Sequence, residues 1–404
     1  MCQKLMMLNK LQLLKNLFVC AGVMVATSAS AGIPEESSAP VIHLGGVSAY
    51  PGFSVIEKSN NNLFRSDVNK QSSLITVVSP SLDLNATRGA NVYSLTYRAD
   101  VARYAQSSAD NYTDQSVFGA ALMTFSSRSL VDFKPEFRAG HDDRGSTFGP
   151  GTADPNTWKN AGFSGAYTYG SKESIAKFVM DVSYNEVNYQ NNRALTAGYD
   201  KTLKYLAGSF NLRMSPKTLA FVKLDNLDIG YKDPTSPFSG KEQHLLLGLT
   251  WKATAQTNGT FKIGQLQKSF NHTYKTFSGD SWEGTVRWSP RKSAYIEWLS
   301  GRKPGESTGI GSFVLSTSNA LDFGYNLSAR TRLHLNVAEL TEEFSTVARI
   351  DKTPSYGLKA EYRLRSWLLG QAEYTHSAKT SRNFTGTTPD FTNDIFLLSI
   401  RTEI

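Results

Sequence analysis

The sequence predicts an all-β protein: a closed, antiparallel, up-and-down transmembrane β-barrel of about 18 strands. Three observations lead to this prediction. Apolar and polar residues alternate over many segments of roughly ten residues, as they do in strands with one apolar face. Short and long connections alternate along the chain, and the first residues have the composition of an export signal. We expect the barrel to occupy residues 47–404 as one domain.

The alternation is clearest in residues 355–374. Every second residue from Tyr356 to Leu364 is apolar, and the residues between them are polar, charged or glycine. Successive side chains of a strand point to opposite faces, so this segment has one apolar face and one charged face. The pattern repeats after Arg365 as far as Tyr374, which predicts a hairpin with the same two faces.

Eighteen segments of this character are the predicted strands. They lie at 47–56, 72–85, 91–103, 112–125, 130–139, 159–169, 174–185, 202–213, 218–230, 242–254, 260–270, 280–288, 293–300, 318–328, 331–341, 354–364, 367–377 and 391–404. Pro51 lies inside the first segment. Because proline cannot donate a hydrogen bond to a neighbouring strand, we expect a sheet edge or a bulge there.

The connections between these segments indicate a chain of hairpins. Short ones lie near 86–90, 126–129, 170–173, 215–216, 255–259, 289–292, 329–330 and 365–366, with longer polar ones between them. Outer-membrane barrels have short periplasmic turns, longer external loops and an even strand count. We therefore expect both termini in the periplasm. The longest connection, Gly140–Trp158, is rich in glycine and proline and is our candidate for a loop folded into the pore.

Residues 1–31 have the features of a secretory signal peptide. Three lysines precede an apolar core at 17–26, and Ala29-Ser30-Ala31 forms a small-x-small cleavage site. Residues 32–46 would then form a short periplasmic lead. Both cysteines, Cys2 and Cys20, fall inside the signal, which predicts a mature chain without disulfides or cysteine ligands.

Composition limits the class of partner. The chain has 404 residues, 43 Lys+Arg, 35 Asp+Glu and a mean hydropathy of -0.33, and no apolar run of about 20 residues follows residue 31. Removing the three signal lysines leaves 40 basic against 35 acidic residues, so we expect no nucleic-acid partner. A soluble β-sandwich or a propeller would also be rich in strands. Neither requires the alternation of short and long connections.

The sequence offers little to an enzyme. No histidine pair has the spacing of a zinc helix motif, and no Gly-x-Ser-x-Gly motif is present. His141-Asp142-Asp143 is the nearest candidate for a hydrolytic or metal cluster, and we interpret it as part of a solvated loop. We expect no catalytic activity, no metal and no cofactor.

The inner face of the barrel is where we expect function to lie. Strand parity predicts that basic residues outnumber acidic ones on this face, which would lower the barrier for an anionic solute. The alternative is that these charges pair across strands and serve packing alone. The predicted pore-lining residues are Arg98, Lys134, Arg138, Lys204, Arg213, Arg287, Lys359, Arg363 and Arg401.

Two segments near the start of the mature chain resemble a known family. Residues 61–67 followed by 73–80, and residues 97–104 followed by 107–114, are similar to the opening hairpins of the outer-membrane β-barrels of exopolysaccharide operons, the EpsL type. The resemblance covers residues 41–125. It implies an outer-membrane exit for a secreted polysaccharide, working with a periplasmic export protein and inner-membrane synthesis machinery, and it implies no catalytic residues. The chain departs from many outer-membrane barrels in ending with Ile404 instead of phenylalanine.

These observations lead to one expectation and its alternatives. We expect an outer-membrane barrel, in contact with lipid, that passes an acidic exopolysaccharide through a wet, mildly basic lumen. The first alternative is a diffusion porin for small anions or oligosaccharides. The second is a barrel enzyme, which would lose hydrolytic activity on replacement of His141.

Overall fold

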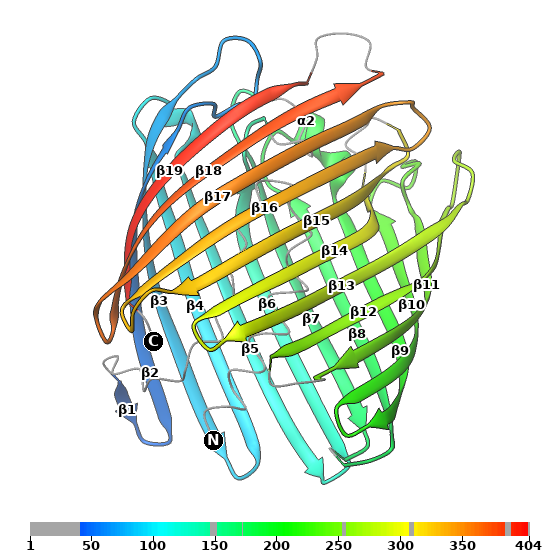
Figure 1. Cartoon of the computed structure of the whole chain (residues 1–404). Helices are drawn as coiled ribbons and strands as arrows, with labels where there is room; N and C mark the ends of the chain where they lie inside the picture. The colour runs from blue at the N-terminus through cyan, green and yellow to red at the C-terminus, as the bar shows by residue number, and fades with distance from the viewer. Residues whose placement is uncertain are drawn as a thin grey trace.

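The protein is a tilted barrel of long antiparallel strands (Figure 1). The structure, a computed structural model, describes residues 41–145, 152–171, 173–252, 256–306, 311–383 and 389–402. The strands are β1 (Ile42–Leu44), β2 (Val47–Asn60), β3 (Ser73–Arg88), β4 (Asn91–Tyr104), β5 (Tyr112–Ser126), β6 (Ser129–Asp142), β7 (Asn156–Tyr169), β8 (Ala176–Tyr189), β9 (Lys201–Ser215), β10 (Thr218–Tyr231), β11 (Gly240–Trp251), β12 (Thr257–Phe270), β13 (Phe277–Arg291), β14 (Ala294–Glu306), β15 (Phe313–Asn326), β16 (Thr331–Phe344), β17 (Ile350–Arg365), β18 (Leu368–Arg382) and β19 (Phe391–Thr402).

The barrel closes between its first and last long strands. Each strand from β2 to β19 pairs with its neighbours in sequence, and β19 pairs with β2 from Ile395–Asn60 to Arg401–Ser54. Lipid offers no hydrogen bonds, so a strand edge exposed to it would leave backbone groups unpaired. The predicted closed barrel of 18 strands is confirmed, with β1 as one additional strand.

Each predicted strand is present, and most are longer than the alternation suggested. The strands have 12 to 16 residues in the barrel, more than the roughly 9–11 that cross a bilayer, so their ends extend beyond the hydrocarbon. The connection predicted at 140–158 is shorter, because Asp142 still pairs with Asn156. The lead predicted at 32–46 contains β1, a strand that was not expected.

Pro51 lies at a gap in the strand pairing on the side of β2 where the barrel closes. This position agrees with the sheet edge that was expected there. One side of β2 pairs with β3 along its full length. The other side pairs with β1 at Val47–Ala49 and with β19 from Ser54 onward. Pro51 falls between these two partners, where the missing N–H leaves no ladder bond unmade.

The wall has an apolar outer face and a polar inner face. The exposed apolar side chains recur at every second position, as in Leu245, Leu247 and Leu249 on β11, each about half exposed. In a closed barrel this exposed apolar row faces lipid, and the residues between face the lumen. The buried polar side chains of the strands include Glu242, Lys268, Asp322, His334 and Glu361.

The two ends of the barrel differ. The short turns, the start of β2 and the end of β19 lie at one end, the lower one in Figure 1. The long loops lie at the other end and hold the three short helices, η1 (Ser108–Asp110), α2 (Arg193–Thr196) and η2 (Ala197–Tyr199). In the part of the chain that is described, no helix has the length and apolarity needed to cross a membrane. Residues 1–31, the predicted signal peptide, lie outside the described residues.

Candidate functional site: the barrel lumen

Eight of the nine predicted pore-lining residues lie on the inner face. Each of them alternates with exposed apolar neighbours on its own strand, as Arg138 does with Phe137. These eight are Arg98, Lys134, Arg138, Arg213, Arg287, Lys359, Arg363 and Arg401. Their role in passing a solute stays a prediction.

Lys204 is the exception, and its predicted position was wrong. It is exposed and shares its face of β9 with the exposed Leu206 and Phe210, so it points away from the lumen. It lies three residues from the long-loop end of its strand and is paired in register with Tyr184 and Asp228. Toward this end the outer face changes from apolar to polar, and a lysine there can extend into water.

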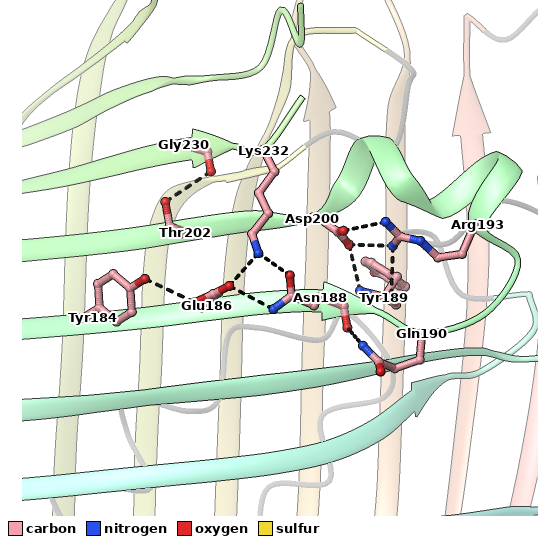
Figure 2. A network of polar contacts seen from close by, with 10 residues as sticks. All are labelled: Tyr184, Glu186, Asn188, Tyr189, Gln190, Arg193, Asp200, Thr202, Gly230 and Lys232. Carbon is pink, nitrogen blue, oxygen red and sulfur yellow. Dashed lines mark hydrogen bonds and ion pairs between the residues drawn. The ribbon is translucent and has the colours of Figure 1, made fainter. Parts of the chain in front are cut away.

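Figure 2 shows a polar region that includes Tyr184, the register partner of Lys204, where β8, the loop between β8 and β9, and the residue after β10 meet. The ammonium of Lys232 contacts Glu186 and Asn188, which share one face of β8. In the loop, the Arg193 guanidinium donates to both carboxylate oxygens of Asp200 at 2.9 and 2.7 Å. Burial opposes the charged form of Asp200, but the bonds from Arg193 and from the Tyr189 N–H outweigh it and hold its pKa below the usual range. These contacts fix the loop without filling the lumen.

In the half of the barrel nearer to the short turns, a series of contacts between polar and charged side chains runs along the inner face. The Arg287 guanidinium carbon lies 3.6 Å from the ring centre of Tyr295, and an Arg287 nitrogen lies 3.9 Å from Glu297. The Tyr295 hydroxyl lies 3.2 Å from Nδ1 of His334 on β16. Aromatic side chains on this face therefore contact cations and histidine of the wall itself.

This series of contacts continues to Glu361, where a histidine, a lysine and an arginine meet. Its carboxylate lies 3.6 Å from Nε2 of His334, 3.4 Å from Nζ of Lys359 and 3.6 Å from a nitrogen of Arg401. Only 6% of Glu361 is exposed. This carboxylate reduces the mutual repulsion of the Lys359 and Arg401 side chains.

Ion pairs also occupy the opposite part of the wall. Arg98 donates to Asp100 at 2.7 Å, and Arg138 lies 3.2 Å from Glu136. Lys134 pairs with Asp132. These three pairs each lie within one strand, whereas Arg287 with Glu297 and Arg401 with Glu361 pair between strands, so the alternative reading of cross-strand pairing accounts for part of the inner charges. The inner face of the barrel therefore carries many ion pairs and is not a continuous basic surface.

The hairpin formed by β14 and β15 bends into the lumen at its tip. Glu306, the last residue of β14, contacts Lys201 on β9 and accepts a 3.1 Å hydrogen bond from the Tyr231 hydroxyl on β10. Lys201 and Tyr231 face inward on the far side of β11, β12 and β13 from Glu306. The tip therefore crosses the inside of these three strands.

Apolar contacts hold the same hairpin tip. Phe313 and Leu315 at the start of β15 are buried against Leu266. The ring centre of Phe313 lies 6.2 Å from that of Phe270 and 5.0 Å from that of Phe277. Burying a phenylalanine side chain contributes roughly 1.5–3 kcal/mol. We call residues 303–306 and 311–316 the inner hairpin.

Beneath this apolar cluster lies a buried ion pair. Lys268 contacts Glu242, and the Lys268 ammonium lies 5.4 Å from the ring of Phe270 and 5.8 Å from that of Phe313. Both charged side chains are less than a tenth exposed. The inner hairpin thus shields a charge pair of the wall from the lumen.

The loop predicted to enter the pore packs against its neighbours where it is described. Arg144 donates to Asp110 at 2.7 Å and lies 4.5 Å over the Phe64 ring. The His141 ring lies 3.4 Å from Asp143, and this bond is the largest cause that holds the pKa of Asp143 at about 2. The predicted position in the pore falls partly on residues 146–151, which lie outside the described residues.

The inner hairpin was not singled out from the sequence, where residues 301–317 were assigned to a polar connection. One signal was present. Phe313, Val314 and Leu315 are three consecutive apolar residues, and all three are buried. A barrel strand alternates between lipid and lumen, so an unbroken buried run indicates that the chain has left the wall.

Comparisons with known proteins agree with this architecture. The model of the family described as "Putative beta-barrel porin 2" matches residues 40–404. The FrpB iron transporter from Neisseria meningitidis, in its apoprotein form, is a similar solved structure with a TM-score of 0.51 and 11% identity, over 83% of this chain and 63% of that one. The chain thus spans less than two thirds of FrpB. OpdK of Pseudomonas aeruginosa, solved with vanillate, has a TM-score of 0.50 and 10% identity, over 87% of this chain and 98% of that one. No curated protein matches the sequence.

Proposed function

We propose that this chain, which belongs to the family described as Putative beta-barrel porin 2, is a diffusion pore of the bacterial outer membrane for small anions and acidic oligosaccharides. The porin-like barrel places the chain in that membrane. Barrels of 16–18 strands leave an aqueous channel. The inner hairpin is the observation that supports a small solute, because it crosses the inside of three strands and narrows the channel.

The charge of the lining supports an anion. On the inner face of the short-turn half, from β13 to β19, the five basic residues Arg287, Arg332, Lys359, Arg363 and Arg401 accompany the four acidic residues Glu297, Asp322, Glu361 and Glu373. A lining with an excess of positive charge lowers the electrostatic barrier for anions and raises it for cations. The orientation belongs to the same proposal: the short turns and both termini face the periplasm. No step of this function calls for catalysis, a metal or a cofactor.

Passage of an exopolysaccharide is the second proposal. The resemblance of residues 61–80 and 97–114 to the EpsL type supports it, and with it a periplasmic export protein and inner-membrane synthesis machinery as partners. An extended polymer would need the inner hairpin to move aside. The contacts of Glu306 with Lys201 and Tyr231 would then act as a latch.

Swelling of vesicles in solutes of graded size tests both proposals. We expect vesicles that hold the wild-type protein to swell in small acidic sugars and to exclude long oligosaccharides. The variant Glu306→Gln/Phe313→Ala loses the ionic and the apolar contact of the inner hairpin, and it should admit larger solutes. Glu339→Gln is the matched control, because Glu339 is exposed on the outer face of β16.

The outcomes separate the proposals. Uptake of long acidic oligosaccharides by the wild type would favour polymer passage over the small-solute pore. Equal size limits in wild type and variant would show that the inner hairpin does not set the limit. A protein that admits no solute in either form would refute passive passage altogether.

A further inference from the structure

Four of the short turns share one sequence pattern: an apolar residue, serine, any residue, then arginine or lysine. We call them the anchor turns, and they are Phe125–Arg128, Met214–Lys217, Trp288–Arg291 and Leu327–Arg330. They join β5 to β6, β9 to β10, β13 to β14 and β15 to β16, so they are spread around the barrel. The same four-residue pattern also occurs outside the short turns, for example at Phe238–Lys241 and Leu299–Arg302, and in these two segments the apolar residue is not strongly exposed.

The apolar residue of each anchor turn is strongly exposed. Phe125 is 69% exposed, Met214 64%, Leu327 62% and Trp288 48%. Each lies two residues beyond another outward position of its strand, so it continues the lipid-facing row to the end of the barrel. Large apolar side chains with this exposure are stable where hydrocarbon meets headgroups, as aromatic girdles show.

The serine of the anchor turn stabilises the backbone conformation of the turn. Its hydroxyl accepts the backbone N–H two residues later: Ser126 from Arg128 at 3.2 Å, Ser215 from Lys217 at 3.2 Å and Ser328 from Arg330 at 3.1 Å. This local bond replaces a ladder bond and stabilises a tight turn. In three of the anchor turns, the same local hydrogen bond therefore fixes the backbone position of the basic residue relative to the apolar residue.

The basic side chains extend into the surroundings. Arg128, Arg291 and Arg330 are exposed and form no ion pair with the residues that the structure describes. Three further short turns carry Arg88, Lys252 and Arg365, also exposed. The long loops instead mix both signs of charge. Seven short turns at this end thus carry an exposed basic residue, although the turn between β7 and β8 also carries the exposed Glu173.

We propose that the anchor turns bind the phosphate groups of anionic phospholipids in the leaflet at the short-turn end. The apolar residue enters the hydrocarbon and the cation lies beside the phosphate, about one side-chain length nearer to water. A soluble polyanion at the pore mouth would be attracted by the cations, but it would not account for the apolar residue beside each of them. The lipid accounts for both.

Unfolding in vesicles of defined composition tests this. The anchor variant is Arg128→Gln/Lys217→Gln/Arg291→Gln/Arg330→Gln. The control variant removes four exposed cations at the long-loop end: Lys241→Gln/Lys275→Gln/Lys352→Gln/Arg382→Gln. Each protein is unfolded with urea in phosphatidylcholine alone and in phosphatidylcholine mixed with phosphatidylglycerol. We expect phosphatidylglycerol to raise the urea midpoint of the wild type and of the control, and the anchor variant to lose most of that rise.

Two results would overturn the proposal. One is that the two variants behave alike: an equal rise in all three proteins would show that the anchor turns contribute nothing, and an equal loss in both variants would make the effect one of overall charge. The other is the same rise when dextran sulfate is added to phosphatidylcholine vesicles, which would identify a soluble polyanion. If the fourfold variant does not insert, Arg128→Gln should show part of the loss and Arg128→Lys should restore it.

Discussion

At the scale of single residues, Lys204 and Arg287 carry the same charge on opposite faces of the wall. Lys204 is exposed beside the lipid-facing row of β9, whereas Arg287 lies against Tyr295 inside the barrel. A unit charge about 10 Å from a solute in water contributes about 0.4 kcal/mol to its energy. Only a charge that borders the lumen can therefore influence a passing ion.

This difference gives a matched pair of variants. We expect Arg287→Gln to reduce the ratio of anion to cation permeability about fourfold, because this charge lowers the energy of an anion and raises that of a cation by about 0.4 kcal/mol each. Lys204→Gln should leave the ratio unchanged. The zero-current potential in a salt gradient measures the ratio for each protein. Equal effects of the two substitutions would show that the lumen does not lie where the strand faces place it.

At the scale of the element, an ion pair between Arg193 and Asp200 joins α2 to the start of β9. Asp200 joins the Arg193 guanidinium to the Tyr189 backbone, and its pKa is lowered in the folded protein. A lowered carboxyl pKa stabilises the fold above the unfolded value, near 3.9, and this contribution is lost as the pH falls through the folded value.

The loop should respond to the loss of this pair. We expect Asp200→Asn to open residues 190–200 at neutral pH, while the strands on either side keep their protection. Amide hydrogen exchange measures both. The same loop in the wild-type protein should open only below the unfolded pKa of aspartate, about 3.9. Full protection of these residues in Asp200→Asn would mean that backbone contacts alone hold the loop.

At the scale of the whole molecule, alternation of apolar and polar residues was enough to predict the barrel. It located all 18 strands because every strand meets lipid on one side and water on the other. The same alternation also indicates that Lys204 does not face the lumen. Lys204 and Arg213 are nine positions apart on one strand, an odd difference, and in an unbroken strand they cannot share a face.

The contacts between side chains of the candidate site could not be predicted from the alternation of apolar and polar residues. The inward bend of β14 and β15 depends on contacts of Glu306 and Phe313 with strands distant in sequence. Likewise, parity assigns Glu361 to the inner face but does not reveal that His334, Lys359 and Arg401 all lie within 4 Å of it. Such contacts between residues distant in sequence depend on barrel closure and strand register, which are properties of the fold as a whole.

Single-channel recording of the mature protein in a planar bilayer tests the central claim most directly. An aqueous lumen narrowed by the inner hairpin and lined with an excess of cations should give a stable, anion-preferring conductance, and Glu306→Gln/Phe313→Ala should increase it. A wild-type protein inserted in the bilayer that passes no ions, or prefers cations, would contradict this account.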